Sequence, residues 1–472
     1  MLRTLTALIV TPVGLLLIVL SLTPLRPRAD FVVATDALRT IDPQRVSWLD
    51  EIQVAAALFE GLTRLDPQTS QPVPGVAERW KWNATRDAVT FHLRADARWQ
   101  TGDPVTAEDF RFAWLRALTP AVEAQYASLL FVIDGAEDYY RSRLNDDPSD
   151  DLAASDVGID VIGDRTLRAR LRGPCSYFLD LAAFPTFAPA HRPTLERWAF
   201  RDGRVLRATQ HLWTRPANIV GNGAFVLREW SFKRRLVLRR NPHYWDADAI
   251  AADTIELDII TDPSSALIGY ETGAIDLVRG LPLEIARVLA DQTRRGLRDD
   301  FHIGDRFATF FFRVNCRRPP LDDARVRKAL SLAIDRDALC EHVLGLGDSP
   351  ALTYVPRGAI KLMPRTAPDG STIYYQPPDG LGAALSYEER VRLARELLAD
   401  AGFYRQSPER PIEISFASDQ PQQRRIAEAI QVMWERELGI RVALRVLERK
   451  VLSQRIRQLD YDIVRSDWYG DY

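Results

Sequence analysis

Short apolar stretches and amphipathic stretches alternate along most of this chain. The continuous run "FVVATD" at Phe31 to Asp36 predicts a buried strand, and "ALRTIDPQRVSWLDE" predicts an irregular, ligand-accessible loop. The next segment, "IQVAAALFEG", predicts a helix that stops at Gly61. Further along, "AVTFHLR" alternates as a strand and "DRTLRARLR" alternates as an edge strand. The pattern mixes strands and helices instead of repeating one unit.

Helix signals in the second half of the chain strengthen this mixed pattern. The stretch "YEERVRLARELLADAGF" is an amphipathic helix that Gly402 should close. After it come "PIEISFAS", the helical "PQQRRIAEAIQVMWERELGI" and "RVALRVLE". A strand, helix, strand unit favours parallel pairing, and the sequence therefore predicts an α/β fold. In the first half, Thr106 with Asp109 three residues on predicts a helix start with an imperfect capping box.

The first residues differ from the rest. Residues 1–29 join Arg3 to an apolar run that ends near Leu22 and is followed by alternating Pro and Arg. Such a segment predicts an export signal or a retained membrane anchor, and the two readings stay open because no clear cleavage site precedes Asp30. A lipoprotein is not expected, since the first cysteine is Cys175. The working part is predicted to be periplasmic or otherwise extracytoplasmic.

Composition excludes several classes of function. The chain has 472 residues, enough for two or three lobes, and 62 basic side chains against 64 acidic ones. This balance does not steer the protein toward nucleic acid. Its three cysteines and six histidines show no spacing typical of a metal site, and no cofactor is expected. Eleven Trp and fourteen Tyr are more informative, because such side chains are enriched where proteins grip ligands.

Seven segments in order resemble the oligopeptide-binding and dipeptide-binding members of the family 5 extracellular solute-binding proteins, the receptors of peptide ABC importers. The segments are "LFEGLTRLD", "PGVAERW", "TFHLRADARWQTGDPVTAEDF", "NIVGNGAFVLREW", "RNPHYW", "LDDARVRKALSLAIDRDAL" and the terminal "VRSDWYGDY". No single one is decisive, but seven in family order are specific. Most of them are expected to be scaffold; "NGAF", for example, predicts a turn that only glycine can make.

The resemblance implies a type II periplasmic-binding-protein-like clamp, with two α/β lobes and a third, inserted domain. It places the first lobe at residues 30–59 and 186–288, the extra domain at 60–185 and the second lobe, incomplete, at 289–472. In the family, such a clamp closes around an extended peptide. Main-chain hydrogen bonds would then supply the affinity, and roomy pockets would accept the side chains.

The terminal segment is the predicted centre of the ligand site. By resemblance, Asp471 holds the ammonium group of the peptide, Trp468 forms a pocket wall and Arg465 orients charge nearby. Asp467 and Tyr469 flank positions whose backbone would pair with the peptide. The structural alternative is that Trp468 belongs to the core and that Arg465 and Asp467 form a surface ion pair worth under about 1 kcal/mol.

Three more residues match places where relatives line the cleft from the other side: Trp48, Leu49 and Tyr126. One position departs from the family. Arg449 stands where some relatives carry a pocket aromatic, which predicts a pocket that favours acidic side chains or a different solute. Relatives also continue beyond the terminal motif, which predicts either a fragment of a longer receptor or a truncated product.

The expected partners are a peptide, an ABC permease and its ATPase, with the receptor itself a monomer. Alternative cargoes within the family are a dipeptide, a nickel chelate, haem or an oligosaccharide. A third alternative is a truncated product that does not transport. An enzyme is not expected, because no GxSxG motif, Ser/His/Asp order or placed pair of carboxylates appears in the sequence.

Overall fold

A computed structural model describes residues 27–145, 147–202, 205–208, 210–304, 308–355, 364–366, 372–374, 378–405, 410–418 and 421–470. The chain divides into two compact units, Met1–Gly280 and Leu281–Tyr472. The predicted export signal or anchor lies almost wholly outside the described residues. No helix in the described part of the chain is both long and apolar enough to cross a bilayer. The three-domain division expected from the resemblance stays a prediction.

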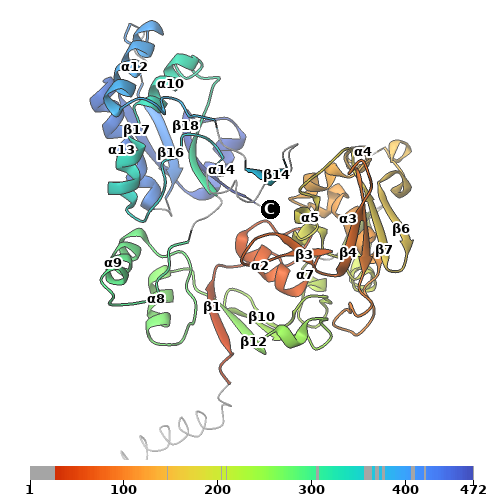
Figure 1. The fold of residues 1–472 in the computed structure, drawn as a ribbon. Coiled ribbons are helices and arrows are strands. Elements are labelled where there is room, and N and C mark those ends of the chain that lie inside the picture. Colours follow the sequence, from red (N-terminus) through yellow and green to blue (C-terminus); the bar gives the residue numbers. More distant parts are fainter. Residues whose placement is uncertain are drawn as a thin grey trace, which may run out of the picture. The chain divides into compact units, whose positions relative to one another are not determined.

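The first unit contains two four-stranded sheets (Figure 1). One has the order β1-β12-β11-β10, in which β1 runs parallel to β12 and the other pairs are antiparallel. The second sheet, β4-β5-β7-β6, is wholly antiparallel. The strands are β1 (Phe31–Thr35), β4 (Ala77–Trp82), β5 (Ala88–Leu93), β6 (Ile159–Gly163), β7 (Thr166–Arg170), β10 (Phe225–Ser231), β11 (Arg235–Arg240) and β12 (Thr254–Ile259), with the short hairpins β2 (Thr63–Leu65) with β3 (Pro72–Pro74) and β8 (Ala199–Asp202) with β9 (Val205–Ala208).

Helices of the first unit pack their apolar residues into one large core. They are α2 (Leu49–Leu58), α3 (Ala107–Ala117), α4 (Ala136–Ser142), α5 (Phe178–Leu181), α6 (Arg192–Arg197) and α7 (Gln210–Trp213). A further helix, α8 (Pro263–Glu271), contributes Ala266 to a separate, smaller cluster. Trp114 of α3 shows how the large core is held together. Its ring meets Phe187 edge to face with centroids 5.4 Å apart, and its Nε1 donates to the Phe187 carbonyl at 2.8 Å. The buried indole therefore has its one polar group satisfied.

The second unit is built on a single four-stranded sheet with the order β13-β18-β16-β17. Its strands are β13 (Ala308–Val314), β16 (Ile412–Ala417), β17 (Val442–Leu447) and β18 (Ile463–Tyr469), and a separate hairpin joins β14 (Pro364–Thr366) to β15 (Thr372–Tyr374). Its helices are α9 (Leu283–Arg294), α10 (Ala324–Leu332), α11 (Arg336–Ala338), the π-helix η7 (Leu339–Leu344), α12 (Tyr387–Asp400), α13 (Pro421–Leu438) and α14 (Arg449–Arg457). Strands β16, β17 and β18 are mutually parallel, and β13 is antiparallel to β18.

Side-chain alternation along β16 explains how helices cover both faces of this sheet. Ile412, Ile414 and Phe416 point to the face where α10, α12 and α13 form the larger core. Ala417 points to the opposite face, where it joins Leu452 of α14 in a smaller cluster. The predicted parallel strand, helix, strand unit is thus confirmed, with α13 as the connection.

Two predictions from the sequence pattern are wrong. The helix α2 begins at Leu49 and ends at Leu58, so Gly61 does not cap it. A Cβ on Gly61 would collide with the Ala182 carbonyl oxygen, so this glycine is needed for close packing. The segment read as an edge strand, β7, lies inside its sheet between β5 and β6. Alternation showed that one face is buried, but it carried no information on how many strands flank it.

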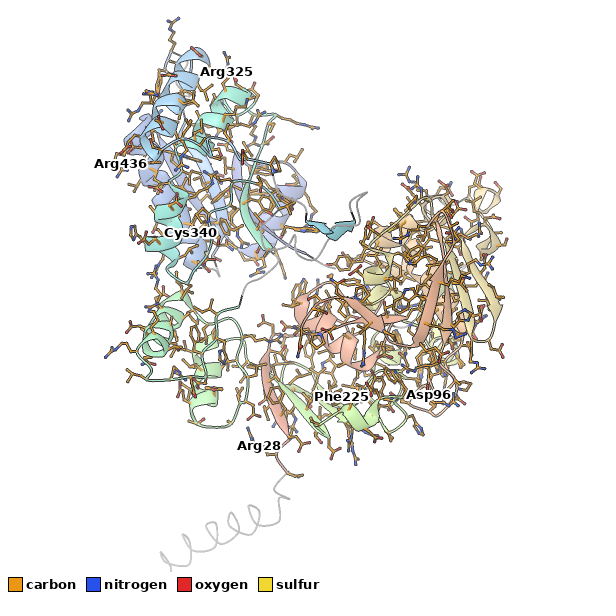
Figure 2. All side chains as sticks on the ribbon, in the orientation of Figure 1. Arg28, Asp96, Phe225, Arg325, Cys340 and Arg436 are labelled. Atoms are coloured by element: carbon orange, nitrogen blue, oxygen red, sulfur yellow. The ribbon has the colours of Figure 1, made fainter. Side chains whose placement is uncertain are left out.

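The helix ends agree better with the sequence. Thr106 is the N-cap of α3, and Asp109 Oδ2 accepts from the Thr106 backbone N–H at 2.8 Å. Gly402 follows α12 with φ +69°, the left-handed conformation that closes many helices. The three cysteines form no disulfide, and Cys340 lies in η7 (Figure 2).

Three of the family-like segments meet in the core of the first unit. The buried Glu60 carboxylate accepts from the Tyr244 hydroxyl at 2.5 Å and from Trp245 Nε1 at 2.7 Å. Burial raises the pKa of this carboxyl group, and the two hydrogen bonds act against that rise. The Glu60 backbone also exchanges hydrogen bonds with the Asn222 amide. The backbone at Gly223 lies against α2, because a Cβ there would lie 2.6 Å from the Ala57 carbonyl oxygen. Position 223 therefore requires glycine, because the backbone passes close to α2. These three segments are scaffold.

Candidate functional site

The two sides of β18 are paired over different lengths. On one side its ladder with β13 continues to Tyr469, opposite Ala308. On the other side its ladder with β16 ends where Val464 lies opposite Ser415. Within the described residues, no strand pairs that second side from Arg465 to Tyr469. Among the described strands, the carboxyl end of β18 is therefore paired on one side alone, by β13.

Arg465 and Asp467 occupy one face of this half-paired strand. Arg465 Nη2 donates to Asp467 Oδ2 at 2.8 Å, and the Arg465 guanidinium carbon lies 4.9 Å from the centroid of the Phe310 ring. Both side chains are only partly exposed. The structure thus shows the ion pair that the sequence left as an alternative, and it adds an aromatic support from β13.

Trp468 occupies the opposite face. It lies across from Thr309 in the ladder and is half exposed, so it is not a core residue. Thr309 Oγ1 donates to the Tyr354 carbonyl at 2.8 Å, and the Tyr354 ring meets Phe311 edge to face at 5.2 Å. The exposed indole therefore extends from a strand pair in which Phe311 of β13 is held by its contact with Tyr354.

Arg449 belongs to the same edge of the sheet. It is the first residue of α14, which follows directly after β17, and β17 runs parallel to β16 and β18. The carboxyl ends of parallel strands share one edge, so exposed Arg449 and Trp468 lie at the same edge. Asp471 lies outside the described residues. The backbone of Tyr469 belongs to β18, but its side chain is not described.

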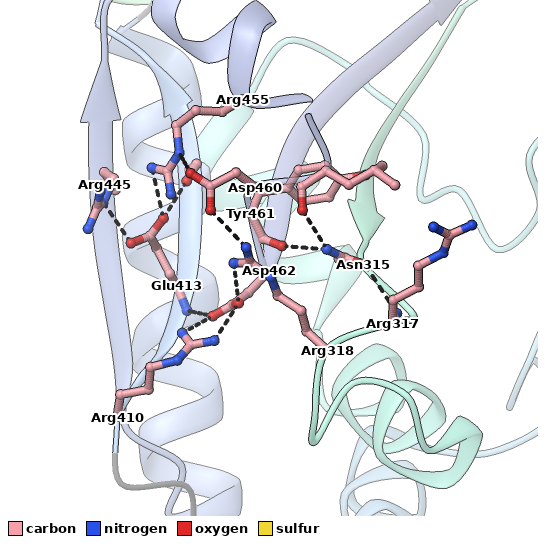
Figure 3. A network of polar contacts seen from close by, with 12 residues as sticks. Asn315, Arg317, Arg318, Arg410, Glu413, Arg445, Arg455, Asp460, Tyr461 and Asp462 are labelled. Carbon is pink, nitrogen blue, oxygen red and sulfur yellow. Dashed lines mark hydrogen bonds and ion pairs between the residues drawn. The ribbon is translucent and has the colours of Figure 1, made fainter. Parts of the chain in front are cut away.

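A polar network fixes the other end of β18 (Figure 3). Asp462, just before the strand, accepts from Arg410 Nη1 at 2.5 Å, from Arg410 Nη2 at 2.8 Å and from the Glu413 backbone N–H at 3.1 Å. Its neighbour Asp460 accepts from Arg318 at 2.7 Å and from Arg455 at 3.0 Å. The network ties the start of β18 to β16, α14 and the segment after β13, and so sets the register of the half-paired strand.

The predicted residues of the first unit occupy two places: Trp48 and Leu49 follow the loop after β1, and Tyr126 precedes the 3-10 helix Ala127–Val132. Trp48 is the N-cap of α2 and Leu49 is its first residue, and both are exposed. Tyr126 is half-buried and meets Phe184 edge to face at 5.0 Å, so it packs against the core. An ion pair of 2.8 Å between Arg45 and Glu123 connects the loop before Trp48 to the segment before Tyr126. The proposed ligand contacts of all three residues stay predictions.

Sequence reasoning missed four residues that hold the loop before α2, the "β1–α2 loop" of residues 36–48. They are Arg39, Asp42, Glu51 and Arg116. One signal was available for Glu51, because it stands three residues after the N-cap, the position typical of a capping box. Nothing in the sequence pairs Asp42 with Arg116, which is 74 residues away. Among the described residues, no group of three His, Cys, Asp or Glu side chains is placed to hold a metal ion.

Comparison with known proteins identifies the relatives of this chain. Residues 71–472 match the family model for bacterial extracellular solute-binding proteins, family 5. The periplasmic oligopeptide-binding protein OppA of Escherichia coli is 30% identical over 439 residues, which cover 92% of this chain and 73% of that protein.

Solved structures give the same result for the fold. The murein tripeptide-binding protein MppA of Escherichia coli matches with a TM-score of 0.75 and 29% identity, covering 95% of this chain and 81% of that one. Haemophilus influenzae OppA in complex with the peptide RPPGFSPFR matches with a TM-score of 0.73 and 27% identity over the same shares. The predicted family membership and α/β fold class are confirmed. This chain belongs to the family 5 bacterial extracellular solute-binding proteins.

Proposed function

We propose that this protein is the substrate-binding receptor of a bacterial ABC importer and that it captures oligopeptides outside the cytoplasm. The observation that carries the proposal is the carboxyl end of β18, where the ladder with β16 ends at Val464, the ladder with β13 continues and Trp468 is half exposed. An extended peptide can add to such an edge as a further strand, with side chains directed alternately to its two faces. The names of the relatives support this ligand class, because they include proteins for oligopeptides and for a murein tripeptide.

Each face of β18 would meet a different part of the ligand. On one face Arg465 is already neutralised by Asp467, so a peptide side chain would meet a balanced pair. On the other face Trp468 offers an apolar surface, which favours a flat or apolar side chain. Arg449, at the same edge of the sheet, is the proposed contact of an acidic side chain. Asp471, in the segment after β18, is the proposed partner of the peptide's ammonium group.

The remaining assignments are part of the same proposal. The protein would deliver its peptide to a permease driven by an ATPase, and it would itself be a binding protein and not an enzyme. Its location would be periplasmic or extracytoplasmic, as in relatives that are named periplasmic. The apolar segment at residues 1–29 would direct export or hold the protein at the membrane.

Isothermal titration calorimetry with defined tripeptides to pentapeptides tests the proposal. We expect Trp468→Ala to weaken binding by at least about tenfold, as for an aromatic contact at the centre of an interface. Tyr404→Ala is the matched control, because Tyr404 is an aromatic residue of the same unit with the same exposed fraction, 49%. It should leave the affinity within about twofold.

The same titrations with N-acetylated peptides test the ammonium contact. Acetylation removes the positive charge and should weaken binding about tenfold, the loss expected for one charge-assisted hydrogen bond. If Trp468→Ala binds peptides as strongly as wild type, the proposal that β18 forms part of the binding site would be wrong. An absence of binding to any peptide, with a different small molecule released from the denatured protein, would favour another cargo of the family.

A further inference from the structure

The β1–α2 loop has no regular secondary structure, yet one buried carboxylate holds both of its ends. Glu51, in the first turn of α2, accepts from the backbone N–H groups of Arg39 at 3.0 Å, Ser47 at 3.2 Å and Trp48 at 3.2 Å. It also accepts from Arg39 Nε at 3.0 Å and from Arg39 Nη2 at 3.1 Å. Both oxygens of Glu51 are therefore used, one mainly at each end of the loop.

The protonation state of Glu51 fits this role. Its side chain is fully buried. Burial alone would raise the pKa of the carboxyl group, but the hydrogen bonds from Arg39 and from the three backbone N–H groups outweigh burial and lower it. Glu51 is consequently charged at neutral pH, and its hydrogen bonds are of the strong, charge-assisted kind.

Arg39 passes this constraint on to an exposed aromatic residue. Its guanidinium carbon lies 3.7 Å from the centroid of the Trp48 ring, within the range of a cation–π contact. The guanidinium cannot turn without breaking its paired hydrogen bonds to Glu51. The Trp48 ring, 48% exposed, is thus held against a fixed plane while much of its surface stays in contact with solvent.

A second buried carboxylate fixes the middle of the loop. Asp42 accepts from Arg116 of α3 at 2.5 Å and 2.9 Å, and Arg116 also donates to Gln44 at 2.6 Å. Gln44 in turn donates to the Ala188 carbonyl at 3.1 Å. The loop is therefore anchored at its start, middle and end within the first unit, without any help from a ligand.

We propose that Glu51 is a positioning residue, which sets the Trp48 ring in its ligand-binding orientation before a ligand arrives. The proposal rests on the function proposed above, in which Trp48 is a ligand contact. Glu51 would raise the affinity without touching the ligand, because the ring loses no freedom when the ligand binds. A protein that recognises peptides through few shared groups gains affinity from such preorganisation.

A double-mutant cycle between Glu51→Gln and Trp48→Ala tests the proposal in peptide titrations. The glutamine keeps the shape of the side chain but loses the charge and one acceptor. We expect Glu51→Gln to weaken binding about fivefold in the wild-type background, the cost of ordering one large side chain. In the Trp48→Ala background the same change should alter affinity less than about 1.5-fold. An equal loss in both backgrounds would overturn the proposal, since Glu51 would then act only through the fold.

Arg39→Lys is the second variant, because it leaves the buried carboxylate in place and removes the planar stack. We expect Arg39→Lys to weaken peptide binding by about as much as Glu51→Gln does. Arg94→Lys is the matched control, since Arg94 also stacks on a tryptophan of this unit, 3.3 Å from the Trp245 ring centroid, and should not change affinity. A loss with Arg94→Lys as large as that with Arg39→Lys would contradict the specific role of the Arg39–Trp48 pair.

Fluorine NMR of protein labelled with 5-fluorotryptophan measures the positioning without a ligand. The Trp48 resonance is assigned by its absence in Trp48→Phe. We expect Glu51→Gln to shift and narrow this resonance as the ring becomes mobile, whereas an unchanged resonance would refute the proposal. If peptides fail to bind but the resonance responds, the proposed function fails and the positioning role remains.

Discussion

The β1–α2 loop of the first unit and the start of β18 in the second unit solve the same problem in different ways. Each holds a predicted ligand-binding segment in place with aspartate or glutamate and arginine. In the loop, Asp42 and its partner Arg116 are both buried, whereas Glu51 is buried and its partner Arg39 is half exposed. At β18, buried Asp462 contacts Arg410 (Figure 3). The Arg410 side chain is 56% exposed.

This difference decides how each clamp should respond to change. A buried charge that loses its partner has no water to replace it, so its loss is costly. An arginine at the surface that loses its carboxylate is hydrated at once, and its attraction is already weakened by solvent and salt. The Asp42–Arg116 pair of the loop should therefore be strong and insensitive to salt, and the Asp462–Arg410 pair at β18 weaker and more sensitive to salt.

The largest effect is expected for Asp42→Ala, which leaves Arg116 buried without its carboxylate. We expect a loss of about 3–5 kcal/mol in the free energy of unfolding. Urea unfolding followed by tryptophan fluorescence measures it, because every tryptophan except Trp434 and Trp468 lies in the first unit. Glu123→Ala is the control: the Glu123 side chain is 67% exposed, so its ion pair with Arg45 should contribute under about 1 kcal/mol. A loss from Asp42→Ala no larger than that of the control would contradict the comparison.

A smaller effect is expected for Asp462→Ala. Four hydrogen bonds to the Asp462 carboxylate are lost, two from Arg410, one from the Glu413 backbone N–H and a long one from Arg318. Arg410 and Arg318 can turn to solvent, so we expect a loss of about 1.5–3 kcal/mol. Hydrogen exchange of the backbone amides in β16 and β18 measures the local loss of stability. The difference from wild type should shrink in about 1 M salt, where the screening length falls to roughly 3 Å. Asp460→Ala, at a more exposed carboxylate, should cost less; a salt-independent loss would show that burial and not surface charge dominates this clamp.

The smallest effect is expected from acid. Hydrogen bonds from Arg410 and the Glu413 N–H overcome burial and lower the pKa of Asp462, as Arg39 and the loop N–H groups do for Glu51. A carboxyl group with a lowered pKa stabilises the folded state above its unfolded value near about 4, and this contribution is lost as the pH falls through the folded value.

We therefore expect the free energy of unfolding to stay unchanged between about pH 7 and 6. Below about pH 4, the difference in this free energy between wild type and Glu51→Gln or Asp462→Asn should become smaller. Urea unfolding at each pH measures both differences. A difference that stays constant down to about pH 3 would mean that the carboxylate charge is not what these sites use.

Much of the local structure followed from sequence alone. The pattern around α13 gave two parallel strands and their connecting helix, Thr106 with Asp109 gave a helix start, and Gly402 gave a helix end. These features depend on residues close in the chain, so periodicity and capping chemistry are sufficient to predict them. The terminal segment also directed attention to Trp468, whose exposure agrees with a role in binding.

Tertiary structure decided the features that depend on distant residues. β18 pairs with β16 and not with β17, its neighbour in sequence, and it leaves β16 after Val464. No local sequence pattern marks the point where this pairing ends. The partners of Asp42 and Glu60 lie 74 and more than 180 residues away, respectively. A sequence pattern records which side chains avoid water, but only the folded chain determines which buried charges meet, because a carboxylate can be buried only where donors from other segments surround it.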